Sequence, residues 1–192
     1  TPNQQHVTLY APNSAGVNRQ AVAATMPLRD PDEPTALTYP QDLKVGDYTV
    51  EETSRRLVLA TGRPAAIGLV IVDPMQNETI WQGALVNEKG SLAEGSSIAL
   101  GRVGDQELAL VGGYGTVAGA GATGVVAVVD LTPLKVAPRG EPTVLAFVAL
   151  SHGASDIVIT DQTAVVASAT GVATLINLTD PSAPKIMGAL SG

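Results

Sequence analysis

The sequence predicts an all-β fold built from short antiparallel strands, and three observations carry that prediction. Short apolar runs rich in Val, Ile, Leu and Ala end at Gly, Pro, Asn or Asp, as strands between turns do. No long window has the 3.6-residue periodicity of a capped amphipathic helix. Similar phrases also recur: GLVIVDP begins at Gly68, GVVAVVDL at Gly124 and GVATLINL at Gly171. A spacing of about 50 residues is typical of arrays of small sheets.

Each recurring phrase is expected to form the third strand of a four-stranded antiparallel unit. The twelve strands expected in the three units are 41–45, 56–61, 68–73 and 80–86; 97–102, 107–112, 125–130 and 143–150; and 155–160, 164–169, 172–177 and 185–190. The first 29 residues fit half a unit, with strands at 6–11 and 20–26. The chain therefore divides into a half blade (1–29), a Pro-rich linker (30–40) and three blades (41–90, 91–150 and 151–192).

Several of these strands are apolar without alternation, among them 69–72 and 125–129. Such strands are expected to be covered on both faces. Sheets that stack face to face around an axis provide this cover and also shield the sheet edges. The expected architecture is a β-propeller-like array of four-stranded antiparallel blades, with about three and a half blades in this chain.

The same segments resemble a known family. The strand 68–73 and the stretch NLTDPSAP at 177–184 are similar to the strand and the following turn of the LVIVD repeat of bacterial and archaeal β-propellers. The resemblance covers roughly residues 36 to 192 and is weaker in the middle unit, where a longer insert precedes Pro142. It implies a propeller fold in a secreted or cell-surface protein, and it implies no particular activity.

A propeller needs at least about four blades to close. The sequence leaves three alternatives open. The chain is a fragment of a longer protein, or another chain supplies the remaining blades, or the units form an open arc whose edge strands pair with further copies. The first alternative is favoured, so the expected partner is another protein or the remainder of the same propeller, with a homo-oligomer as the alternative.

Composition argues against several classes of function. The net charge is -7 and the 11 Lys and Arg residues are scattered, which argues against nucleic acid as a partner. Aromatic residues are 3% of the chain, so stacking platforms for single strands are scarce. Cysteine is absent, which removes thiol nucleophiles and Cys-ligated zinc. No apolar run of about 18 residues occurs, so no transmembrane helix is predicted.

Two segments are candidates for binding. Asp30, Asp32 and Glu33 cluster between prolines, and Ca²⁺ prefers such oxygen ligands, although a solvated acidic turn is the more ordinary interpretation. No other cofactor is expected. Tyr114, with Gly113 and Gly115 beside it, lies in a glycine-rich stretch that predicts a flexible loop between strands. This stretch lacks the Lys-Ser/Thr pair of a phosphate-binding loop, and it is the candidate binding loop.

Polar residues also follow the third strand of each unit. Asp73, Asp130 and Asn177 occupy equivalent positions, where they are expected to bind turn backbone rather than to form a ring of ligands.

The two histidines, His6 and His152, suggest no catalytic site. Ser151 and Asp156 lie close to His152 in sequence, but neighbours in a chain rarely face each other and no G-x-S-x-G motif is present. A surface-loop histidine is expected, and no catalytic residue is assigned.

The function expected from the sequence is that of a non-enzymatic scaffold or protein-interaction module in an extracellular or cell-surface protein. Binding would use loops at one end of the blades or an unpaired edge strand. The alternatives are a self-assembling subunit that pairs through open edge strands and a metal-assisted hydrolase that uses the acidic loops.

Overall fold

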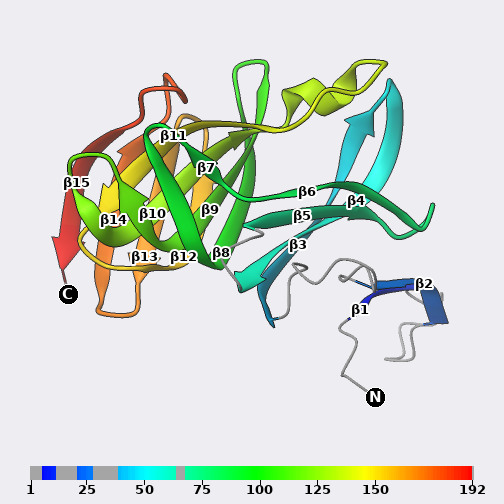
Figure 1. Ribbon diagram of the computed structural model, residues 1–192, viewed down its shortest axis with the longest axis horizontal. Helices are drawn as coiled ribbons and strands as arrows, with labels where there is room; N and C mark the ends of the chain where they lie inside the picture. Colours follow the sequence, from blue (N-terminus) through cyan, green and yellow to red (C-terminus); the bar gives the residue numbers. More distant parts are fainter. Residues whose placement is uncertain (1–5, 12–20, 28–38, 64–67, 192) are drawn as a thin grey trace.

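The computed structural model describes residues 6–11, 21–27, 39–63 and 68–191, and these form antiparallel sheets (Figure 1). A hairpin of β1 (His6–Ala11) and β2 (Ala21–Pro27) precedes three larger sheets. The first sheet consists, in spatial order, of β3 (Tyr39–Val50), β4 (Thr53–Arg63), β5 (Leu69–Asp73) and β6 (Glu78–Gly83).

The second and third sheets have the same sequential order. The second sheet contains β8 (Gly90–Val103), β9 (Gln106–Val117), β10 (Gly121–Asp130) and β11 (Thr143–Leu150), and the short β7 (Val86–Asn87) pairs with the start of β8. A 3₁₀ helix, η1 (Thr132–Lys135), lies between β10 and β11. The third sheet contains β12 (Ala154–Thr160), β13 (Thr163–Ser168), β14 (Val172–Asn177) and β15 (Lys185–Ser191).

The predicted all-β class is confirmed, and the larger sheets are antiparallel with four strands in the first and third and five in the second. Every strand expected from the sequence overlaps an observed strand. One difference concerns 80–86: β6 ends at Gly83, and Val86 begins β7 in the second sheet. The linker expected at 30–40 lies outside the described residues as far as residue 38, and β3 begins at Tyr39.

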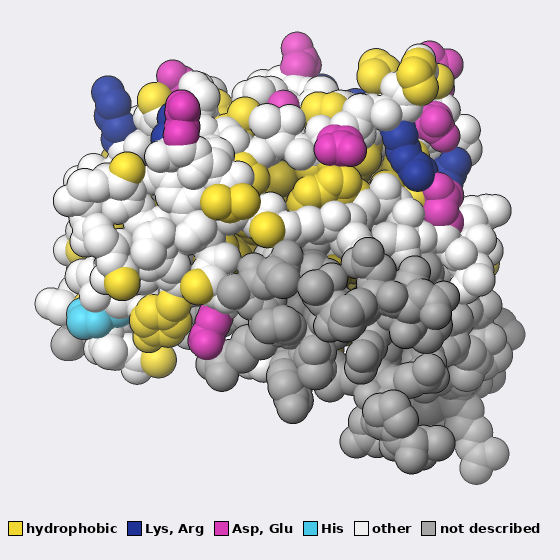
Figure 2. All heavy atoms as spheres, viewed as in Figure 1, with side chains coloured by type: hydrophobic (Ala, Val, Ile, Leu, Met, Phe, Trp, Pro, Cys, Tyr) yellow, Lys and Arg dark blue, Asp and Glu magenta, His cyan; other side chains and the backbone are white. Residues whose placement is uncertain are grey.

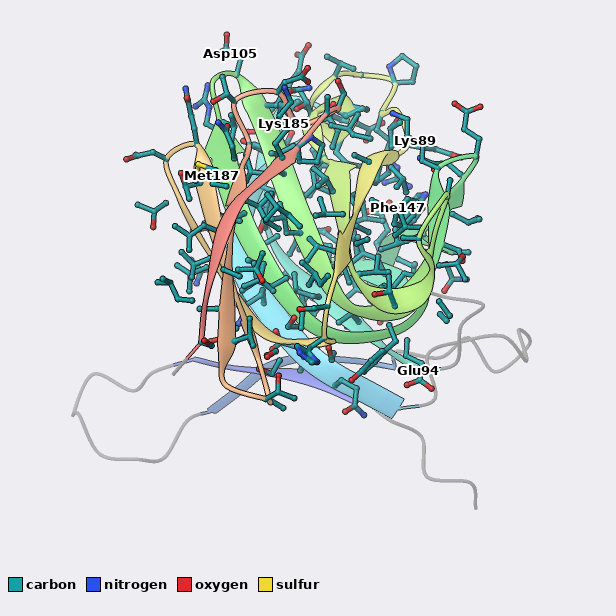
Figure 3. All side chains as sticks on the ribbon, turned by 90° about the vertical axis from the view of Figure 1, so that its left-hand side faces the viewer. Lys89, Glu94, Asp105, Phe147, Lys185 and Met187 are labelled. Atoms are coloured by element: carbon teal, nitrogen blue, oxygen red, sulfur yellow. The ribbon has the colours of Figure 1, made fainter. Side chains whose placement is uncertain are left out.

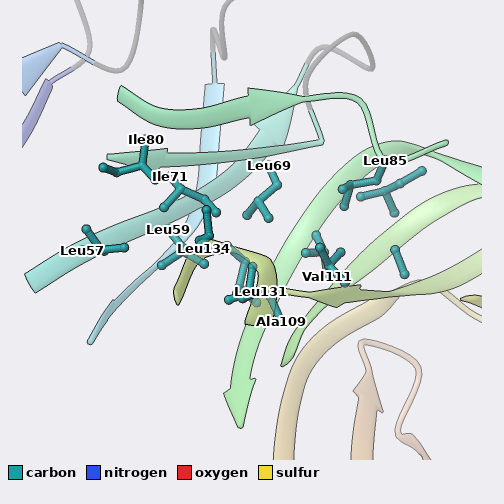
Figure 4. Close-up of a cluster of buried hydrophobic side chains, with 14 of the residues drawn as sticks. Leu57, Leu59, Leu69, Ile71, Ile80, Leu85, Ala109, Val111, Leu131 and Leu134 are labelled. Atoms are coloured by element: carbon teal, nitrogen blue, oxygen red, sulfur yellow. The ribbon is translucent and has the colours of Figure 1, made fainter. Parts of the chain in front are cut away.

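The hydrophobic core consists of two clusters, one on each side of the second sheet. β10 explains this arrangement, because Val125, Ala127 and Val129 face the first sheet while Val126 and Val128 face the third. All five side chains are fully buried, so the prediction that this strand is covered on both faces is confirmed. The labelled side chains in Figure 4 show the first cluster, in which Leu and Ile from β4, β5 and β6 meet residues of β9 and η1.

β8, the first long strand of the second sheet, lies next to β3 and β12, the first strands of the other two sheets. β8 packs against β3 and β4 on one side and against β12 on the other. A hydrogen bond fixes part of this contact: the backbone N–H of Ile98 donates to Asp42 Oδ2 over 2.8 Å.

The third and fourth strands share one irregularity in every sheet. A register shift lies just before the Asp or Asn that ends the third strand, between Ile71 and Val72, Val128 and Val129, and Leu175 and Ile176. A bulge adds a residue to one strand and bends it. The three sheets are therefore bent at matching positions.

Charged residues make up 15% of the chain. On the face drawn in Figure 2, Lys, Arg, Asp and Glu lie mainly along the upper rim, with hydrophobic side chains exposed between them. Within the described ranges, no helix combines the length and the apolar composition that a membrane span requires.

Candidate binding groove

An open groove of about 620 Å³ lies at one end of the second sheet, where the candidate binding residues occur. Its walls include Glu94 from β8, Tyr114 and Gly115 from β9, and Thr123 from β10. Glu94 marks this end of the molecule at the bottom of Figure 3. The structure thus brings Tyr114 and Gly115 into one concave surface.

The glycine-rich stretch forms strand and not the flexible loop that the sequence predicted. Residues 112–117 belong to β9, and only 118–120 form the turn to β10. The glycines are needed because the paired strands β8 and β9 approach each other very closely beside the register shift between Leu92 and Glu94. A Cβ on Gly113 would lie 1.8 Å from the carbonyl oxygen of Glu94, and one on Gly115 would lie 2.0 Å from that of Ser91. These glycines therefore permit close backbone approach, which is an established use of glycine.

Tyr114 is held in place on one side and open on the other. Its ring lies against the backbone of Gly153, where an added Cβ would be 2.4 Å from Cζ. The side chain is nevertheless 56% exposed. A ring that is fixed and still accessible loses little conformational entropy when it binds, so Tyr114 is suited to act as an anchor for a partner.

Thr116, Thr123 and Ser151 contribute hydroxyl groups to the groove beside small apolar residues. Thr116 and Thr123 make hydrogen bonds within the protein, Thr116 with Ser91 outside the groove. Ser91 Oγ and Thr116 Oγ1 are 2.9 Å apart, and Thr123 Oγ1 donates to the carbonyl oxygen of Leu150. Glu94 is the charged residue among those that line the groove. The surface can accept an uncharged chain segment, and its described residues do not combine a base, a nucleophile and an acid.

A second polar cluster joins the first sheet to the segment between η1 and β11. Glu78 accepts from Arg139 over 2.5 Å and from Arg55 over 2.7 Å. The hydrogen bond from Arg139, with that from Arg55, holds the pKa of Glu78 below its ordinary value. Arg55 also lies 3.8 Å from Asp73 and from Glu51. The three carboxylates outnumber the two guanidinium groups, so the cluster does not form an anion site. Its ion pairs connect the first sheet to the segment before β11.

The polar residues that follow the third strands bind backbone, as predicted. Asp73 Oδ1 accepts the N–H groups of Met75 and Gln76 at 3.0 and 3.1 Å. Asp130 Oδ1 accepts from Thr132 at 2.9 Å, and Asn177 Oδ1 accepts from Thr179 at 2.7 Å. Each side chain thereby closes an Asx turn.

The other candidates are not brought into a site. Asp30, Asp32 and Glu33 lie outside the described residues. In the part of the chain that the structure describes, no three His, Asp or Glu residues are grouped to hold a metal ion. His152 is exposed in the bend between β11 and β12, which confirms the predicted surface position. Asp156 Oδ1 accepts the N–H of Ile157.

Sequence reasoning missed the groove partners of Tyr114 and the whole Glu78 cluster. Strand pairing puts Glu94 opposite Tyr114 and Thr123 opposite Gly115, and Arg139 is 61 residues from Glu78. No local motif marks such neighbours. Neither a protein-family model nor a curated protein matches this chain, so the LVIVD resemblance stays a prediction.

Proposed function

We propose that this chain is a non-enzymatic, propeller-type scaffold that serves as a protein-interaction module of a secreted or cell-surface protein. One observation carries the proposal. Three sequential antiparallel sheets pack face to face, and their first long strands β3, β8 and β12 lie side by side. Blades around a common axis have this arrangement, because the first strand of each blade is the one nearest the axis.

The details of the sheets support the same proposal. The matching bulges and the Asx turns at Asp73, Asp130 and Asn177 fit three copies of one unit. The similarity of 68–73 and 177–184 to the LVIVD repeat agrees with such copies.

The interaction surface in this proposal is the Tyr114 groove. It lies at one end of a sheet, where scaffolds of stacked sheets commonly bind partners. An accessible Tyr over small residues is typical of an interface anchor. Apart from Glu94 the lining is uncharged and consists of small apolar residues with a few hydroxyl groups, which fits an extended, uncharged segment of a partner protein. The hydrolase alternative would use Asp30, Asp32 and Glu33, and no observation on the described residues favours it.

The binding role is tested by selecting displayed peptides on the immobilised chain and measuring their affinities for two variants. Tyr114→Ser is expected to weaken the selected peptides by at least about tenfold, because it removes the anchor. Val136→Ser is the matched control, since Val136 is 59% exposed outside the groove. Peptides that bind Tyr114→Ser as tightly as the parent chain would exclude the groove as the interaction surface.

A further inference from the structure

The face of the third sheet that points away from the second sheet has an apolar middle row, and no described strand or helix covers it; we call it the outer face. Its middle row consists of Val158, Val165 and Leu175, which are paired across β12, β13 and β14. Val158 is 54% exposed and Val165 is 38% exposed. In Figure 3 the third sheet lies at the left of the view, and its side chains on that side border open space.

The outer face corresponds to faces that are buried in the other two sheets. In the Val165–Leu175 pair, Leu175 lies on β14 two residues before Asn177. The equivalent pairs are Leu59–Ile71 and Leu110–Val128, each two residues before the Asp that ends its third strand. All four of those side chains are 0% exposed, because each pair packs against the next sheet along the chain. The middle row of the outer face thus has the composition of an internal interface, and no sheet of the described residues packs against it.

The charges on the outer face are arranged to suit a second copy of the same face. Among its described residues, Asp156 and Lys185 carry the charges, and the strand register puts them at diagonally opposite corners. Thr160 and Leu190 occupy the other two corners. Strands are about 4.8 Å apart and rise about 3.3 Å per residue, so the face measures about 14 by 13 Å and is nearly square.

We propose that a second copy of this chain covers the outer face in a two-fold symmetric dimer. A two-fold axis along the Thr160–Leu190 diagonal places each Asp156 opposite Lys185 of the second copy. Val165 and Leu175 of both copies then meet at the centre. The strands of the two copies cross at about 90°, which is one of the two preferred arrangements of packed sheets. The small face predicts a weak dimer, with a dissociation constant in the micromolar range or above.

The dimer is tested by sedimentation over about 5 to 500 µM, a range that spans such dissociation constants. The average mass is expected to rise from 19.5 kDa towards twice that value. Val165→Asp is expected to abolish the rise, because it puts a carboxylate at the centre of the interface. Val136→Asp is the matched control at an exposed valine elsewhere and is expected to leave the rise unchanged. A parent chain that stays monomeric, or a Val165→Asp variant that still dimerises, would overturn the proposal.

Charge reversal tests the orientation of the two copies. Asp156→Lys and Lys185→Asp each place like charges at both ends of the dimer, so each is expected to weaken it by about tenfold. An equimolar mixture of the two variants is expected to form a heterodimer of parental affinity, because both charge pairs are then restored. A mixture no tighter than its components would overturn the diagonal dimer. Tyr114→Ser should dimerise normally, so a failure of the groove and a failure of the dimer are measured separately.

Discussion

Arg139 Nη1 lies 2.5 Å from Glu78 Oε1, and this ion pair joins the second sheet to the first. Arg139 belongs to the segment that leads into β11, while Glu78 begins β6. The other oxygen of Glu78 accepts from Arg55 on β4. Backbone hydrogen bonds from Glu51 and Glu52 to Leu134 and Lys135 run beside this pair. The segment 131–142 is therefore fastened to the first sheet at several points.

Arg139→Ala is expected to lower the free energy of unfolding by up to about 1 kcal/mol near neutral pH, the usual range for a partly exposed pair. The folded-state pKa of Glu78 is depressed, so its contribution is present above the unfolded value of about 4.3 and is lost as pH falls through the folded value. Urea unfolding at neutral pH and at about pH 3 would measure this loss. A deficit of the same size at both pH values would contradict the role given to Glu78.

Asp42→Ala is expected to lower the free energy of unfolding by about 1 to 3 kcal/mol, because the buried N–H of Ile98 loses its acceptor. Asp42→Asn keeps an oxygen at that position and should cost less. Lys44→Ala is the control, since Lys44 only forms a 3.4 Å ion pair with the same carboxylate. Chemical unfolding of the three variants gives the comparison. A Lys44→Ala loss as large as that of Asp42→Ala would show that the ion pair dominates.

Gly113→Ala is expected to destabilise the second sheet by about 1 to 3 kcal/mol or more, since its Cβ would collide with the backbone of Glu94. The collision would also separate β8 from β9 and open the groove. Gly188→Ala is the matched control, because no atom lies within 4 Å of a Cβ built there. Thermal unfolding in dilute solution distinguishes the two variants. Equal melting temperatures would mean that β8 and β9 can move apart freely.

Ile71→Ala and Leu175→Ala change equivalent positions in the first and third sheets. Ile71 is fully buried, so its truncation is expected to cost about 2 to 5 kcal/mol. Leu175 lies on the outer face, so Leu175→Ala is expected to lower the free energy of unfolding by about 1 kcal/mol or less in dilute solution. Denaturant midpoints under identical conditions measure the difference. Similar losses at the two positions would show that the outer face is covered even in the monomer.

Strand positions followed from the sequence because the evidence for them is local. An apolar run such as 125–129 between turn residues specifies a strand whatever lies next to it. The role of Asp73 was predictable for the same reason, since an Asx turn spans only a few residues.

The Tyr114 groove and the Glu78 cluster could not be predicted in this way. Gly113 suggested a loop because glycine serves both flexible turns and strands that approach each other closely, and only the pairing with β8 distinguishes the two. The Glu78–Arg139 pair depends on where the insert after β10 lies in space. Nothing in the spacing of the two residues indicates that they meet.

The sequential order of strands within each sheet has a consequence for synthesis on the ribosome. Every strand of a sheet pairs with its neighbour in the chain, so hairpins can close while later residues are still being added. The first sheet can complete its own hydrogen bonding as soon as β6 emerges. One side of it, however, gains its cover only when the second sheet follows. If synthesis stalls after the first sheet and before the second, the nascent chain would expose the hydrophobic side of the first sheet. We expect chaperones to bind it at that stage.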